Sequence, residues 1–153
     1  MARQYSVTFS AAPITAAQDL FEVTAAAAGI VRLVGLAIGQ YSDPGDAQAE
    51  QLSLTVVRGY TTSGSGGSAF TPLALNSGDP AAAAAAEINN TTVATTGTAA
   101  VLWADVWNVQ AGYQVWWPPE NRPTARNSER IVVRITAPAD SITTNSTLLF
   151  EEE

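Results

Sequence analysis

Three acidic residues lie close to a cluster of tryptophans and have the chemistry of an acid and base pair. Asp105, Glu120 and Glu129 flank the tryptophans, all four of which lie in segment 100–120. Glycoside hydrolases use two carboxylates around a bound sugar, and aromatic side chains often border such sites. The alternative is a set of core aromatics with surface acids, and it is favoured because tryptophan commonly dominates β-sandwich cores. We therefore predict no catalytic residue at this cluster.

A second group of carboxylates has the spacing of a possible cation site. Asp43, Asp46 and Glu50 fall in one short stretch beside Pro44 and Gly45, and carboxylate oxygens are ligands for hard cations. The stretch lacks the alternating ligand pattern and glycine placement of an EF-hand loop. A solvated turn is favoured, so we predict no metal site and no bound cofactor.

The composition excludes the most common catalytic systems. The chain of 153 residues has no His, no Cys and no Lys, and its seven basic residues are all Arg. The chain therefore lacks the residues for several common sites: Ser-His-Asp and Cys-His nucleophiles, His or Cys zinc sites, Schiff-base lysines and the P-loop lysine. We expect a protein that is not an enzyme. The net charge of −7 also disfavours nucleic acid and anionic membranes as partners.

Two adjacent tryptophans are candidates for a partner interface. Trp116 and Trp117 occupy neighbouring positions in an extended segment, and neighbouring strand residues point to opposite faces. One of them should therefore face solvent or a partner. Protein contact and stacking on a sugar both remain open for that residue.

Four arginines form the second candidate interface. Four of the seven positive charges lie in one short stretch of an otherwise acidic chain, at Arg122, Arg126, Arg130 and Arg134. Arginine is well suited to docking on an acidic partner. The same residues could instead form a solvated face that is paired with nearby acids. The sequence leaves these two interpretations equally open, with Arg122 and Arg126 as the interface candidates.

Alternation of apolar and polar side chains predicts a succession of short strands. We expect strands at residues 3–10, 19–25, 30–41, 50–60, 129–138 and 146–152. Segment 30–41 is apolar on both faces, which is typical of a strand in the middle of a sheet. Pro13 should end the first strand, and the Gly- and Ser-rich segment 61–68 should form a flexible surface loop.

The tryptophan segment is predicted to form a β-hairpin. Residues 101–109 and 113–117 are predicted to form two strands, and the first should have side chains packed on both faces. Gly112 in the short connection tolerates a tight turn. Burial of one tryptophan removes roughly 200 Å² from water, which is worth about 5 kcal/mol as an upper bound. Trp103 and Trp107 should therefore supply much of the core.

Residues 60–100 show little periodicity and are expected to form a long irregular insertion with a contact role. Asp79 followed by Pro80 resembles a helix start, and the alanines after it predict a short helix near 80–88. About eight strands with helix only in this insertion indicate an all-β fold, a single antiparallel β-sandwich or barrel spanning residues 1–153. The N-terminus lacks a signal-peptide pattern, so export by that route is not expected.

Several segments together carry a resemblance that covers nearly the whole chain. They are RQYSVTFSAAPITAAQDLFEVTA (3–25), SDPGDAQAEQLSLTVVRGYTTSGSGGS (42–68), NNTT (89–92), WNVQAGYQVWWPPENR (107–122) and STLLFEEE (146–153). The chain resembles small virion proteins of tailed bacteriophages, of the capsid decoration or cement type. The resemblance implies a jelly-roll-like β-sandwich, commonly trimeric, which is made in the host cytoplasm and binds the major capsid protein on the outer capsid surface.

These features favour a non-enzymatic structural protein that decorates or stabilises a phage shell. The alternative is a carbohydrate-binding module or adhesin, associated with a head fibre or tail, that uses an exposed tryptophan as a stacking platform. Under the first reading, segment 60–100 and one of the two adjacent tryptophans should lie at subunit contacts.

Overall fold

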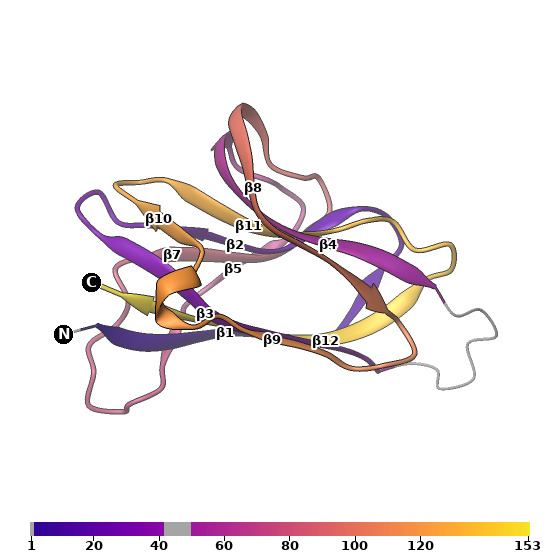
Figure 1. Ribbon diagram of the computed structural model, residues 1–153, viewed down its shortest axis with the longest axis horizontal. Coiled ribbons are helices and arrows are strands. Elements are labelled where there is room, and N and C mark those ends of the chain that lie inside the picture. Colours follow the sequence, from indigo (N-terminus) through magenta and orange to yellow (C-terminus); the bar gives the residue numbers. More distant parts are fainter. Residues whose placement is uncertain (1, 42–49) are drawn as a thin grey trace.

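Two antiparallel sheets pack face to face in the computed structural model, which describes residues 2–41 and 50–153 (Figure 1). Sheet A has the order β10 (Thr124–Arg126), β3 (Ile30–Gln40), β12 (Ile142–Glu152), β1 (Arg3–Ile14) and β6 (Leu73–Ala74), and β9 (Tyr113–Trp116) also pairs with β3. Sheet B has the order β5 (Ser68–Phe70), β7 (Ala85–Asn90), β2 (Gln18–Thr24), β11 (Arg130–Ile135), β4 (Gln51–Thr62) and β8 (Thr95–Asn108). A short 3-10 helix, η1 (Pro119–Asn121), separates β9 from β10.

The chain passes repeatedly from one sheet to the other. Strands β1, β3, β9, β10 and β12 belong to sheet A, whereas β2, β4, β8 and β11, which alternate with them along the chain, belong to sheet B. The order β1–β12–β3–β9 opposite β2–β11–β4–β8 is that of a jelly roll. The expected all-β, jelly-roll-like sandwich is confirmed.

Alternate residues of the strands form the core between the sheets. In β1 the side chains of Tyr5, Val7 and Phe9 are buried while their neighbours face outward. Phe9 contacts Phe21 of sheet B, with ring centroids 5.2 Å apart. Strand β1 continues past Pro13, contrary to our prediction. Beyond its two pairs with β6 it is hydrogen-bonded only to β12, so a residue without an N–H is tolerated there.

Strand β3 lies inside sheet A, as predicted, but its faces are not those that simple alternation gives. An irregularity between Leu33 and Gly35 shifts the register against β12. Because an extra residue reverses the alternation, Leu33 and Leu36 both point into the core.

The predicted β-hairpin at the tryptophans is wrong. Strand β8 pairs with β4 in sheet B, whereas β9 pairs with β3 in sheet A. The connection between them therefore carries the chain from one sheet to the other. A short glycine-containing connection suits a sheet-to-sheet corner as well as a hairpin, and the free edges of β3 and β4 decide the pairing. Nor is β8 buried on both faces, since Val101 and Val106 are 61% and 53% exposed.

The helix predicted near 80–88 is also wrong. This region contains β7, which pairs with β2, and the backbone N–H groups of Ala83 and Ala84 donate to the Glu152 carboxylate at 2.9 and 2.6 Å. These tertiary bonds and the free edge of β2 override the helix propensity of alanine. The segment 60–100 is therefore irregular only in part, because it contains the end of β4, all of β5, β6 and β7, and the start of β8.

Candidate functional site

The outer face of sheet A carries an exposed tryptophan. Trp116 is 60% exposed and lies opposite Gly35 on the neighbouring strand β3. A Cβ atom added to Gly35 would come within 2.6 Å of Trp116 Cε3 and 2.8 Å of Cζ3. The six-membered ring of Trp116 therefore occupies the space that any larger residue at position 35 would need. Because Gly35 has no side chain, the indole of Trp116 packs directly on the sheet and is held in a fixed position.

A shallow depression of about 630 Å³ lies next to this tryptophan on the same sheet. Gln114, two residues before Trp116 on β9, is part of its lining, with Ala37 opposite it on β3 and Thr147 next to Ala37 on β12. Thr8 of β1 completes this row. The full lining is Thr8, Phe9, Ser10, Ala37, Ile38, Gly39, Gly112, Tyr113, Gln114, Asn145, Ser146 and Thr147. None of these residues carries a charge at neutral pH.

Trp117 is not an exposed interface residue. Its side chain is buried between the sheets and meets Trp103 edge-on, with ring centroids 5.9 Å apart and an interplanar angle of 87°. This geometry is favourable for two aromatic rings. The two adjacent tryptophans thus point to opposite faces, as strand geometry requires, and only Trp116 is available to a ligand or partner.

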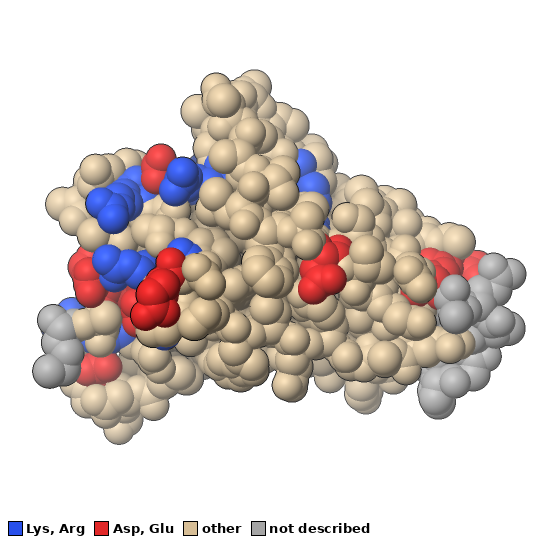
Figure 2. Space-filling model, viewed as in Figure 1, with Lys and Arg blue, Asp and Glu red and all other residues tan. Residues whose placement is uncertain are grey.

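Of the two arginine candidates, Arg122 is held by contacts within the fold and Arg126 is exposed. Arg122 pairs with Glu151, with Nη1 and Oε2 2.6 Å apart, and its Nε donates to the Trp117 carbonyl at 3.4 Å. Arg126 is exposed, and its guanidinium forms no ion pair with the part of the chain that the structure describes. Figure 2 shows the basic side chains of the viewed face gathered mainly at one end, intermixed with acids.

Arg134 belongs to a buried ion pair on the outer side of sheet B. Its Nε and Nη2 donate to the two carboxylate oxygens of Asp19 at 2.6 and 3.1 Å, and Asp19 is fully buried. Its Nη1 donates to the Tyr60 hydroxyl at 2.8 Å. Burial alone would lower the pKa of Arg134, but the hydrogen bonds and charge of Asp19, with Tyr60, outweigh it and raise the pKa. The pair links β2, β4 and β11.

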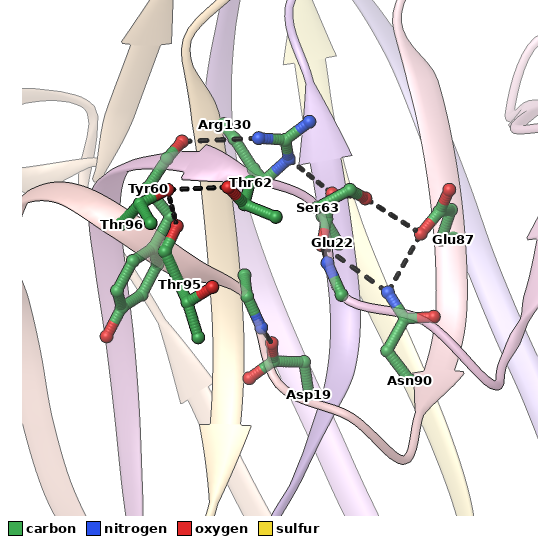
Figure 3. Close-up of polar contacts among 12 residues, drawn as sticks. Asp19, Glu22, Tyr60, Thr62, Ser63, Glu87, Asn90, Thr95, Thr96 and Arg130 are labelled. Atoms are coloured by element: carbon green, nitrogen blue, oxygen red, sulfur yellow. Dashed lines mark hydrogen bonds and ion pairs between the residues drawn. The ribbon is translucent and has the colours of Figure 1, made fainter.

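Glu22 is the centre of a second buried network (Figure 3). Arg130 Nε contacts one of its oxygens. Ser63 Oγ lies 2.6 Å from Oε1, and the Gly64 N–H donates to Oε2 at 3.0 Å. Asn90 Nδ2 donates to Oε2 at 3.4 Å. The predicted flexible loop 61–68 is therefore attached to the sheet by the carboxylate beneath it, which is the usual way to satisfy a buried charge.

Neither network could be predicted from the sequence. Asp19 and Glu22 are the acidic residues of β2, three positions apart among apolar side chains, and the sequence predicts them on the polar side of a half-buried strand. The missed signal is register: β11 places Arg134 directly opposite Asp19, and that pairing depends on tertiary structure. Both carboxylates have their partners within the fold, so their contacts support a structural role.

Two of the three acids considered for catalysis, Asp105 and Glu129, have local structural contacts. Asp105 accepts a hydrogen bond from the Tyr113 hydroxyl at 2.9 Å, and Glu129 accepts one from the Arg126 N–H at 3.0 Å. Glu120 lies in η1. Asp43 and Asp46 lie outside the described residues, and Glu50 accepts hydrogen bonds from the backbone N–H groups of residues 139 and 140. Within the described ranges, no group of three or more acidic side chains is arranged to hold a metal ion.

Strand β8 is one of the two edge strands of sheet B. It has fourteen residues, only Trp107 is buried, and Asp105 is its single charged residue. By register, Val101 lies opposite Val57 and Val106 opposite Ser53, and neither partner belongs to the core between the sheets. The edge thus exposes two apolar side chains and, among the described strands, pairs on one side only.

Comparisons with protein-family models, with curated proteins and with solved structures find no match. Over the residues that the structure describes, no helix is long and apolar enough to cross a membrane.

Proposed function

We propose that this protein is a non-enzymatic structural component of a tailed-phage virion that binds the outer capsid surface and stabilises or decorates the shell. Its partner is the major capsid protein, and it acts as a homo-oligomer, for which a trimer is favoured. The role follows from the resemblance of the chain to capsid decoration proteins. In the structure, the observation that supports it best is the edge strand β8, which pairs on one side only among the described strands.

An edge strand with little charge is suited to contact with another protein. Free sheet edges pair readily with other chains, and soluble proteins usually protect them with lysines, prolines or inward charges. Strand β8 has no Lys or Pro, and Val101 and Val106 are among the most exposed apolar residues of the described chain. An irregularity at Leu102 divides the strand and leaves 103–108 as a regular stretch against β4. A shell subunit that covers this stretch would remove Val106 from water, and one that also covers the residues before Leu102 would remove Val101.

The adjoining ends of β4 and β8 extend this surface. They project from the body of the sandwich as a two-stranded ribbon (Figure 1). Thr96 Oγ1 lies 2.8 Å from Thr61 Oγ1 and 2.6 Å from Thr62 Oγ1, so hydroxyl contacts hold the ribbon together. Most of the side chains here are exposed. A projecting ribbon can reach a neighbouring subunit, which agrees with the contact role expected for residues 60–100.

No reaction centre is evident in residues 2–41 and 50–153, and this favours a structural role. The sequence has no His, Cys or Lys, and the buried carboxylates Asp19 and Glu22 are held by arginines and backbone N–H groups. A catalytic acid or base must reach a substrate proton. Neither residue does so, because both lie under covering segments of the fold.

Co-purification tests the proposal. The protein is produced together with the major capsid protein of its phage, and intact particles are isolated by density gradient. We expect the protein on the particles at a ratio fixed by the capsid lattice. Free protein that is absent from particles, and that is a monomer in solution, would contradict the proposal and favour the carbohydrate-binding alternative.

A further inference from the structure

We propose that the outer face of sheet A binds a neutral polysaccharide, with Trp116 as the stacking platform and the adjacent depression as the subsite for the next sugar units. Strand β8 lies in the other sheet, so this site is separate from the proposed docking edge.

Trp116 has the properties of a platform. It is 60% exposed, although its six-membered ring is seated on Gly35. A tryptophan held in one place loses little conformational freedom when a ligand covers it, which favours binding. A pyranose with equatorial hydroxyl groups presents a face of C–H bonds, and that face is apolar enough to pack on an indole. The exposed area of Trp116 therefore suits a sugar ring.

The depression supplies hydrogen-bonding groups at a suitable spacing. Gln114 and Thr147 lie one cross-strand row beyond Trp116, and residues two apart on a strand are separated by roughly 7 Å. The side chains of Gln114, Thr147 and Thr8 form no hydrogen bond with other residues that the structure describes. Their amide and hydroxyl groups are thus free to bind sugar hydroxyls.

Small side chains keep the floor of the depression open. Ala37 and Gly39 are the outward-facing residues of β3 after Gly35, and a Cβ atom added at Gly39 would meet nothing within 4 Å. Wall residues stand on both sides of this floor, with Gln114 on β9 and Thr147 on β12. The result is a trough that runs along β3 away from Trp116. An extended chain of sugars has this shape.

The charge of the site favours an uncharged glycan. The lining of the depression is wholly uncharged, and the chain as a whole carries a net charge of −7. An anionic polysaccharide would find no arginine in the trough and would be repelled by the protein. A protein partner is also less suitable, because it would desolvate the hydroxyl and amide groups without matching each of them.

The test measures binding of the full chain to hydroxyethylcellulose and cellohexaose, with mannan and laminarin as further neutral glycans. Affinity electrophoresis and isothermal titration calorimetry report binding, and acrylamide quenching reports the accessibility of Trp116. We expect binding of at least one neutral glycan with a Kd below about 1 mM and protection of Trp116 from quenching. Trp116→Ala should weaken binding roughly ten- to hundredfold, the range for loss of one stacked ring. Trp116→Phe should retain most of it.

Two further variants separate the trough from the docking edge. Gly39→Leu should fold normally, because the added side chain enters open space, and it should weaken binding by filling the trough. Val106→Ser on β8 should leave glycan binding unchanged. The proposal is overturned if none of the four neutral glycans binds, if binding survives Trp116→Ala and Gly39→Leu unchanged, or if alginate binds more tightly than every neutral glycan. None of these results depends on whether the protein binds particles.

Discussion

Trp116 and Gly35 form a single unit on the outer face of sheet A, because the ring of one occupies the side-chain position of the other. The distance from an added Cβ at Gly35 to Trp116 Cε3 would be 2.6 Å, which is shorter than a real contact allows. Gly35 is therefore needed for close approach, and not for an unusual backbone angle. The exposure of Trp116 and its fixed position have the same origin.

Gly35→Ala should displace Trp116. The added methyl group must push the ring aside, so the variant should lose about 1 kcal/mol in the free energy of unfolding through overpacking and become more sensitive to acrylamide quenching. Gly39→Ala is the matched control on the same face of β3. A Cβ atom added at Gly39 has no neighbour within 4 Å, so this substitution should leave the free energy of unfolding unchanged or raise it by up to about 1 kcal/mol. If urea unfolding shows the same change in the free energy of unfolding for both substitutions, the close packing of Trp116 on Gly35 is contradicted.

Trp107 should be the most important tryptophan for stability. Its side chain is almost fully buried, and its Nε1 donates to the Ala111 carbonyl at 2.7 Å. Trp107→Ala should lower the free energy of unfolding by roughly 3–5 kcal/mol. Trp103 is only partly buried, so its replacement by alanine should cost less. Urea unfolding measures both, with the exposed Val106→Ala as a control expected to stay within about 0.5 kcal/mol. A change below about 1 kcal/mol for Trp107→Ala would contradict its core position.

Period-two alternation explains why most strands could be predicted. In segment 3–10 the buried residues recur at every second position, and one buried face is enough to identify such a strand. The same rule predicted that Trp116 and Trp117 point to opposite faces. It could not say which of them is exposed, because that depends on the sheet that lies behind each residue.

Pairing between distant segments could not be predicted in the same way. The corner at Gln110–Gly112 has the local features of a hairpin turn, and the Asp79-Pro80 pair has those of a helix start. Both were overridden by partners far away in sequence: β3 for β9, and β2 with Glu152 for the alanine segment. The exposed position of Trp116 could not be predicted either, because it depends on contact with Gly35 of another strand.

The buried pair of Asp19 and Arg134 should be stabilising only as a pair. Asp19→Ala leaves the Arg134 guanidinium without its carboxylate and the Ala94 N–H without its acceptor, and should cost roughly 3–5 kcal/mol. The double variant Asp19→Ala/Arg134→Leu should recover part of that loss. Arg126→Ala, at an exposed arginine, is the control and should change the free energy of unfolding by less than about 0.5 kcal/mol. Thermal and urea unfolding would compare the double variant with the two single variants, Asp19→Ala and Arg134→Leu. If the losses of stability in the two single variants simply add in the double variant, the pair is not coupled.

Stability should fall at alkaline pH partly through Tyr113. Burial raises the pKa of its hydroxyl, and Asp105 adds to the rise through a hydrogen bond and its negative charge, whereas the Trp103 side chain opposes it. The folded state therefore holds this proton more tightly than the unfolded chain, in which the pKa is about 10. The contribution is constant below that pH and is lost as the pH rises above it. Urea unfolding at several pH values from about 8 to 11 should show a shallower alkaline decline for Tyr113→Phe than for the wild type. Parallel curves would contradict this assignment.

The most direct test of the proposed virion role is the occupancy of purified capsids by the wild type and by a β8 variant. Val106→Lys adds a charge at the exposed edge, and Leu75→Lys makes the same change at a residue that is also 53% exposed but lies beside sheet A. Both variants should fold, because both side chains are largely in solvent. We expect the wild type and Leu75→Lys to reach the same occupancy and Val106→Lys to fall at least about tenfold in affinity for the shell, as expected when a charge is placed in an apolar contact. Equal occupancy for all three proteins would contradict docking through β8, and no occupancy for the wild type would contradict the virion role itself.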